Sequence, residues 1–186
     1  MKRLIILSIL AVVLIASPVV AGQATIGTNF GLSWLVPAGP GDTQTILAWP
    51  GAVGGLQPGL RVGYLLDRSQ HEFFLDSGLL LADVEQRFDL TGNYQYNFRP
   101  DTGWDPYATA GLGLLVNSIE IGPVDVNATS FLIGAGVGSR WKVADDGGAI
   151  RIEFRFDKVT QGKDGEVVVT DEGVVYSLKF GFDLWL

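Results

Sequence analysis

The sequence predicts an all-β protein, an eight-stranded antiparallel up-and-down β-barrel, on three observations. Eight segments of the 186-residue chain alternate apolar and polar residues with a period of two. Clusters of Gly, Pro, Asn and Asp separate these segments, as turns and loops do. Mean hydropathy is +0.29 although the formal net charge is -7, and no second long apolar run follows the N-terminus. The apolar residues are therefore distributed along strands and not gathered in a spanning helix.

The N-terminus has the pattern of a cleavable signal peptide. Lys2 and Arg3 precede an apolar run over residues 4–16, and small residues follow up to Ala21 or Ala24. A membrane anchor is the alternative, but about 13 apolar residues fall short of the roughly 20 that span a bilayer. We expect residues 1–21 to be the signal peptide and residues 22–186 to form one exported barrel domain.

Composition excludes several function classes. The chain is acidic, and Lys2-Arg3 is its longest basic cluster, so we expect no nucleic-acid partner. It contains no Cys and a single His, which leaves few residues for zinc sites, thiol chemistry or histidine-based catalysis. We expect no metal, no cofactor and no enzymatic activity.

The first four predicted strands cover residues 24–34, 56–67, 72–82 and 88–98. Each places apolar side chains on one face and small or polar side chains on the other. The pattern is weakest in residues 72–82, where Phe74 and Leu80 fall in the polar row. In residues 88–98 the apolar row is interrupted by Gly92.

The last four predicted strands cover residues 107–116, 129–142, 150–157 and 174–186. Glycines fill much of the second face in residues 107–116 and 129–142. Alternation is strict in residues 150–157, where the apolar row is Ile150, Ile152, Phe154 and Phe156. The terminal segment alternates from Val174 to Leu186.

The connections differ in length. Residues 35–55, 117–128 and 158–172 are long, residues 68–71, 83–86 and 143–149 are short, and residues 99–105 are intermediate. In an antiparallel meander, the connections that start at 35, 83, 117 and 158 share one side. Three of these four are the longest, as expected when outer loops are long and periplasmic turns are short.

Period two alone does not tell which face points inward. A soluble, lipocalin-like carrier has its apolar row inside around a ligand, whereas a transmembrane barrel has it against lipid. The second row combines glycine with charge, which suits a narrow interior where long charged side chains need small neighbours. Strands of about eleven residues also match the length that a tilted strand needs to cross the hydrocarbon. We therefore predict a transmembrane β-barrel.

In this orientation the charged residues of the second row form a lumen network in which opposite charges balance. The row holds seven cations, Arg61, Arg87, Arg140, Lys142, Arg151, Arg155 and Lys179, and seven anions, Asp67, Glu72, Asp76, Asp89, Glu153, Asp157 and Asp183. Aromatic residues at strand ends are expected to form interfacial girdles: Trp34, Tyr64, Phe98, Tyr107, Trp141 and Tyr176.

Three stretches carry a family resemblance. They are residues 105–113 (DPYATAGLG), residues 134–141 (GAGVGSRW) and the alternating terminal strand. Together the chain resembles the small eight-stranded outer-membrane β-barrels of Gram-negative bacteria, of the OmpA-like transmembrane-domain type. The resemblance implies a monomer in the cell outer membrane, among its lipid and lipopolysaccharide, inserted by the barrel-insertion machinery through the C-terminal strand. The family usually ends on an aromatic residue, whereas here Trp185 is penultimate and Leu186 is last.

His71 is the only candidate general base. Some eight-stranded outer-membrane barrels modify lipid A with a histidine near the outer leaflet, but His71 falls in a predicted periplasmic turn, so we expect a surface histidine. Acidic residues of the last long loop can bind divalent cations or simply be solvated: Asp164, Glu166, Asp171 and Glu172. The first loop carries an apolar stretch that can touch a partner or fold over the barrel mouth: Ile46, Leu47, Ala48 and Trp49.

Two functional classes remain open. One is a barrel with a side-chain-filled lumen that supports the envelope or interacts through its outer loops, because eight strands leave room only for side chains. The alternative is a narrow, porin-like channel for small solutes or ions. A lipid A-modifying enzyme and a soluble carrier are further alternatives that the sequence favours less.

Overall fold

The computed structural model describes residues 22–38, 44–48, 59–66, 70–81, 85–121, 124–143 and 147–186. The expected signal peptide, residues 1–21, lies outside the described residues. No helix in the described ranges is long and apolar enough to cross a membrane. The described chain forms eleven strands: β1 (Gln23–Pro37), β2 (Gln44–Ala48), β3 (Gly59–Leu66), β4 (His71–Leu81), β5 (Glu85–Asn97), β6 (Trp104–Ile121), β7 (Val124–Val143), β8 (Gly148–Val159), β9 (Gly162–Asp164), β10 (Val167–Thr170) and β11 (Gly173–Trp185).

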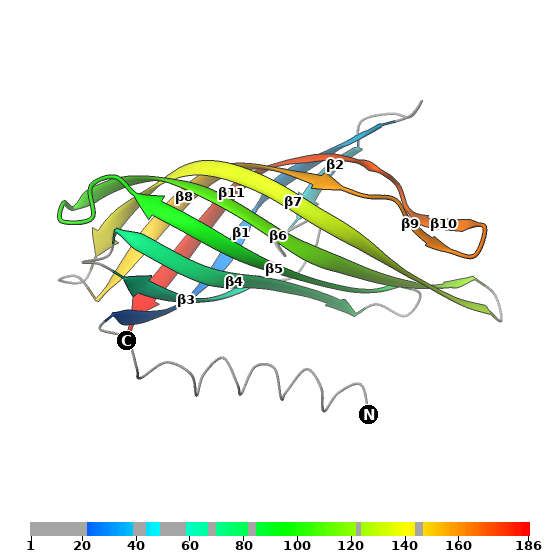
Figure 1. Ribbon diagram of the computed structural model, residues 1–186, viewed down its shortest axis with the longest axis horizontal. Helices are drawn as coiled ribbons and strands as arrows, with labels where there is room; N and C mark the ends of the chain where they lie inside the picture. Colours follow the sequence, from blue (N-terminus) through cyan, green and yellow to red (C-terminus); the bar gives the residue numbers. More distant parts are fainter. Residues whose placement is uncertain are drawn as a thin grey trace.

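Eight of these strands close into one antiparallel barrel (Figure 1). Their order around the barrel is β1-β3-β4-β5-β6-β7-β8-β11, and β11 pairs with β1 from Thr25 opposite Trp185 to Pro37 opposite Gly173. Neighbours in the barrel are thus neighbours in the chain, apart from three short strands inserted in the connections. This confirms the predicted up-and-down topology.

The second barrel strand is interrupted. β3 pairs with residues 23–29 of β1, and β2 takes over from Gly31 to Leu35 on the same side. Ala48 lies opposite Gly31 and Gly59 opposite Asn29, so residues 49–58, which are outside the described part, separate two nearly adjacent ladder positions. The expectation that 35–55 is entirely a loop is therefore wrong. β2 supplies partners for β1 backbone groups that β3 does not reach.

The connections gather at two ends. The turn end holds the connections after β3, β5 and β7 together with the C-terminus, and the loop end holds the connections after β1, β4, β6 and β8 (Figure 1). The expected loop 117–128 is wrong, because β6 and β7 stay paired as far as Ile121 and Val124. Residues 158–172 likewise contain the β9–β10 hairpin. In these segments the backbone stays paired although the side chains no longer alternate between apolar and polar. A search for alternation therefore does not detect these parts of the strands.

Burial separates the two faces of the wall. Leu112, Phe131, Ile133 and Val137 are 61–70% exposed on the outside, whereas the four arginines of the interior are at most 1% exposed: Arg61, Arg140, Arg151 and Arg155. The apolar row therefore faces outward and the polar row inward. This is the arrangement of a transmembrane barrel and the opposite of a soluble carrier.

Most of the predicted girdle residues lie on the outer face near the strand ends. Phe98, Trp141 and Tyr176 are exposed, and Trp34 and Tyr64 are half-buried. Tyr107 is the exception, because it is 1% exposed and its hydroxyl donates to Glu153 inside the barrel. Its position in the row of Thr109 and Gly111 directs it inward, so its prediction as a girdle residue is wrong.

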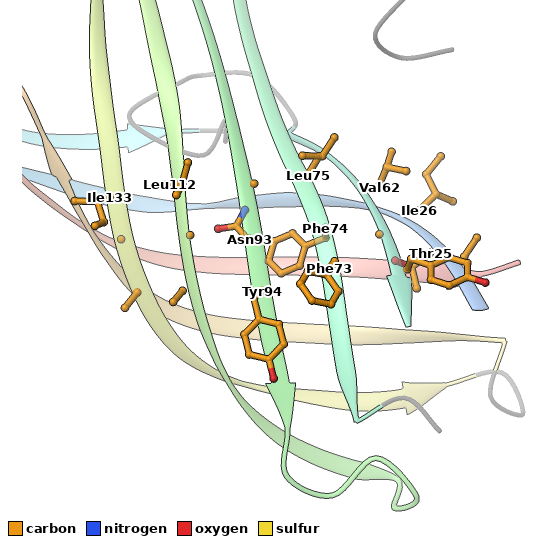
Figure 2. A pocket seen from close by; sticks show the side chains of 18 of the residues that line it. Thr25, Ile26, Val62, Phe73, Phe74, Leu75, Asn93, Tyr94, Leu112 and Ile133 are labelled. Atoms are coloured by element: carbon orange, nitrogen blue, oxygen red, sulfur yellow. The ribbon is translucent and has the colours of Figure 1, made fainter. Parts of the chain in front are cut away.

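A mostly apolar pocket lies in the wall of the barrel (Figure 2). Ile26, Val62 and Leu75 stand side by side in register on β1, β3 and β4, and Leu112 and Ile133 extend the surface onto β6 and β7. Three small residues between them leave space at the surface of the wall: Gly92, Ala110 and Ala135. Such a surface suits contact with lipid chains.

Val137→Arg tests this orientation. We expect it to lower the free energy of unfolding by about 2–4 kcal/mol, because an arginine then faces hydrocarbon near the middle of the wall. The matched control is Val168→Arg on β10, which projects beyond the wall and is expected to cost about 0–1 kcal/mol. Urea unfolding in phospholipid vesicles, followed by tryptophan fluorescence, measures both. Equal costs for the two variants contradict the orientation.

Candidate functional site

The candidate site is the barrel interior. The buried charged residues of the described chain are five cations and seven anions: Arg61, Arg140, Arg151, Arg155 and Lys179, and Glu72, Asp76, Asp89, Asp105, Glu153, Asp157 and Asp183. Of the residues that the sequence predicts for the lumen network, Arg87 and Lys142 are half-buried, and Asp67 lies outside the described residues. The remaining members are all buried inside.

Glu72 is the centre of the network near the turn end. Its Oε1 accepts from Arg61 Nη2 at 2.9 Å and from Thr25 Oγ1 at 3.2 Å, and its Oε2 accepts from Arg140 Nη1 at 3.1 Å. Arg140 Nη2 donates to Asp105 Oδ2 at 3.1 Å. One carboxylate on β4 thus links β1, β3 and β7 across the interior, and Arg140 extends the link to β6.

Arg61 reaches two further groups. Its Nη2 also donates to Gln95 Oε1 at 2.9 Å, and its guanidinium carbon lies 3.4 Å from the centroid of the Phe74 ring. Phe74, which interrupts the polar row of β4 in the sequence, therefore faces inward and offers a cation–π surface to a desolvated arginine.

Asp183 is the centre of the next layer. Its Oδ2 accepts from Arg151 Nε at 2.5 Å, and its Oδ1 lies 3.9 Å from Arg61 Nε. Arg151 Nη2 donates to Asn29 Oδ1 at 2.7 Å, and Asn29 Nδ2 donates to Asp76 Oδ1 at 3.2 Å. This chain of contacts crosses β8, β11, β1 and β4.

A third layer surrounds Glu153 and Arg155. The Tyr107 hydroxyl donates to Glu153 Oε2 at 3.1 Å, and Arg155 Nε donates to both carboxylate oxygens of Asp157 at 2.8 and 3.0 Å. Arg155 Nη1 lies 3.9 Å from Glu153 Oε1. Lys179 is paired in register with Glu153 across β8 and β11 and is 3% exposed.

Glycines make room for these side chains. A Cβ at Gly134 would collide with the carboxylate of Asp157, and one at Gly111 would collide with the amide of Asn93. A Cβ at Gly181 would lie 2.6 Å from Arg151 Nη2. The combination of glycine and charge in the sequence therefore reflects a steric requirement of a narrow lumen.

The sequence prediction missed some lumen residues. Asp105 is fully buried and bound to Arg140, but it precedes the predicted strand 107–116. Asp105 lies two residues before Tyr107, so extending the inward row of Tyr107 and Thr109 towards the N-terminus identifies it as a lumen residue. Neutral amides of the same rows also take part, among them Asn29, Gln95 and Asn97.

The other candidates lie outside the lumen. His71 begins β4 at the turn end, and a ring nitrogen, Nδ1, lies 2.7 Å from the Tyr94 hydroxyl among outward aromatic side chains. In the last loop, Glu172 pairs with Lys158 at 3.4 Å, and Asp164 accepts from the Asn127 backbone N–H at 2.9 Å. Within the described ranges, no group of three or more His, Cys, Asp or Glu residues is placed to hold a metal. Ile46, Leu47 and Ala48 lie in β2, and Trp49 is outside the described residues.

The fold and the polar interior define an eight-stranded transmembrane β-barrel. No family model and no curated protein matches the sequence. The barrel is similar to the crystal structure of Neisserial surface protein A (NspA), with a TM-score of 0.63 and 14% identity over 87% of this chain and 96% of that chain. It is also similar to the N-terminal β-barrel domain of Pseudomonas aeruginosa OprF, with a TM-score of 0.55 and 15% identity over 88% of this chain and 99% of that chain. The predicted resemblance to eight-stranded outer-membrane barrels is thus confirmed at the level of the fold.

Glu72→Gln tests the network. We expect a loss of about 3–5 kcal/mol in the free energy of unfolding, because the change leaves Arg61 and Arg140 buried beside a neutral amide. The matched control, Glu172→Gln, breaks the exposed pair with Lys158 and is expected to cost about 0–1 kcal/mol. Urea unfolding in vesicles compares the two variants. A Glu72 variant as stable as the control refutes this role of Glu72.

Proposed function

We propose that the protein is an outer-membrane β-barrel with a side-chain-filled lumen, which supports envelope integrity or interacts with the surroundings through its loop end. The observation that carries the proposal is the pairing of an apolar outer wall with a buried ionic interior. An apolar wall matches a lipid surrounding, and eight strands leave an interior that side chains fill. The fold shared with outer-membrane barrels supports the same location.

The loop end is the part that carries surface contacts in this proposal. The β6–β7 and β9–β10 hairpins project there beyond the rest of the barrel (Figure 1). β10 exposes Val167 and Val168, and acidic residues flank it. The surrounding partners are outer-membrane lipid and lipopolysaccharide, and the chain acts as a monomer.

Membrane insertion uses the C-terminal strand in this proposal. β11 closes the barrel on β1, and the Leu186 backbone N–H continues the ladder by donating to the Ala24 carbonyl at 2.9 Å. Leu186 points outward and is 75% exposed. In this proposal the insertion machinery meets the apolar outer row of β11, which includes Phe182 and Leu184.

A lipid A-modifying activity is disfavoured by the position of His71. The residue lies at the turn end, opposite the end where the long connections gather, and its ring contacts tyrosines. Its described contacts are with the Tyr94 hydroxyl and the rings of Tyr94 and Tyr96. The proposal therefore includes no catalytic residue.

Fractionation of cells tests the location. We expect the protein in the outer-membrane fraction, and faster migration on gels before boiling than after it, because a closed barrel stays compact in detergent until heated. Recovery as a soluble periplasmic protein contradicts the proposal.

A deletion strain separates the two roles of the barrel. If the barrel wall itself supports the envelope, deletion is expected to increase sensitivity to detergent. A chain with residues 162–170 replaced by a short glycine turn is then expected to restore resistance. A shortened chain that inserts and is heat-modifiable, yet restores nothing, assigns the role to the hairpin instead. Unchanged sensitivity in the deletion strain contradicts a role in envelope integrity.

A further inference from the structure

The turn between β5 and β6 is fixed by hydrogen bonds at the turn end of the barrel (Figure 1). The Arg99 carbonyl accepts from the Thr102 backbone N–H at 3.1 Å and from the Thr102 hydroxyl at 2.9 Å. The Arg99 backbone N–H donates to Asp105 Oδ1 at 3.0 Å, and Oδ2 of the same carboxylate accepts from Arg140 inside the barrel. The ionic interior therefore holds the backbone from which the Arg99 side chain extends.

The Arg99 side chain is exposed and lies against an outward aromatic ring. Its guanidinium carbon is 5.7 Å from the centroid of the Trp104 ring, which is a cation–π contact. Among the described residues, Arg99 forms no ion pair with a carboxylate, and Asp101 in the same turn is exposed to water. The described protein thus orients this positive charge at its surface without giving it a counter-charge.

Two exposed tryptophans adjoin the cation. Trp104 and Trp141 lie directly opposite each other on β6 and β7 and are 47% and 42% exposed. Phe98, immediately before Arg99, is also exposed, and Ile150 continues the row of Trp141 onto β8. Indole rings favour the boundary between hydrocarbon and lipid headgroups. We call Phe98, Arg99, Trp104 and Trp141 the turn-end patch, and in a membrane-inserted barrel it lies at this boundary.

The exposed charges described at the loop end have a different balance. Lys158 pairs there with Glu172 at 3.4 Å. Exposed carboxylates outnumber exposed lysines in this region: Asp164, Glu166, Asp171 and Glu172 against Lys158 and Lys163. An anionic headgroup therefore meets a more favourable charge at the turn-end patch than at the β9–β10 hairpin.

We propose that the turn-end patch binds an anionic phospholipid, with the headgroup phosphate on Arg99 and the acyl chains against the tryptophan pair. The planar guanidinium donates N–H groups in a fork that matches phosphate oxygens. A headgroup with a net negative charge keeps this attraction, whereas a choline headgroup carries its own cation beside the phosphate. The contact with Trp104 orders the arginine before the lipid binds, which lowers the entropy lost on binding. The inference rests on the proposed function, a barrel inserted in the outer membrane.

Competition between two lipids tests the patch. The protein is purified in a neutral detergent with equal amounts of phosphatidylglycerol and phosphatidylcholine that have the same acyl chains, and native mass spectrometry counts the retained lipids. We expect about fivefold more phosphatidylglycerol than phosphatidylcholine, because one arginine near an anionic lipid contributes roughly this factor. Arg99→Gln is expected to lower the ratio to about one, since glutamine keeps hydrogen-bond donors but not the charge.

Two variants and a third lipid make the result specific. Lys163→Gln removes an exposed cation from β9 at the loop end and is expected to leave the ratio unchanged. Arg99→Lys keeps the charge without the planar fork, so its ratio is expected to lie between those of the unchanged chain and Arg99→Gln. Lipid A also carries phosphates and is offered in a separate mixture, where we expect its retention not to depend on Arg99.

Four results overturn the inference: equal retention of the two phospholipids by the unchanged chain, an unchanged ratio in Arg99→Gln, no recovery in Arg99→Lys, or the same loss in Lys163→Gln. Retention of lipid A that depends on Arg99 also overturns it, because the patch then serves another lipid. Membrane insertion and heat-modifiable migration are recorded for every chain. Failure of the unchanged chain to insert counts against the proposed function, whereas insertion with any of these results counts against the patch only.

Discussion

Closure of the backbone ladder between β11 and β1 is the constraint on which the other features depend. A strand surrounded by hydrocarbon has no water to satisfy its N–H and C=O groups, so a sheet in lipid must have no free edge within the membrane. The pairing from Thr25–Trp185 to Pro37–Gly173 removes that edge. β2 serves the same need where β3 ends early. Closure with eight strands then fixes a lumen that only side chains can fill.

The ionic interior follows from that narrow lumen. Once the outer row is committed to lipid, the inner row can be polar only if its charges satisfy one another, because an unpaired buried charge is costly. Glu72 and Asp183 do this by each serving two arginines from different strands. Replacing such a network by apolar side chains need not destabilise a protein, but removing one member does. The network is therefore better understood as fixing the register of the strands than as a source of net stability.

The sequence predicted most of the wall because alternation is strictest where lipid lies outside. Residues 150–157 alternate without exception and lie within β8. Prediction was weaker beyond the lipid, where β6 and β7 continue to Ile121 and Val124 with no apolar row to maintain. Tyr107 was assigned to the wrong face because an aromatic residue at a strand end fits either face. Asp105 was missed because the inner row was not extended past the end of the predicted strand. Contacts such as Arg140 with Glu72 depend on closure, which local patterns do not encode.

A cluster of four inward apolar residues illustrates the same limit more sharply. In the sequence, Leu115, Leu132, Val159 and Val175 are single departures from the polar row of four different segments, and each alone reads as an imperfection of the pattern. Only the register of the closed barrel brings them into one cluster. Strand register, more than composition, therefore decides which inner side chains meet in the lumen.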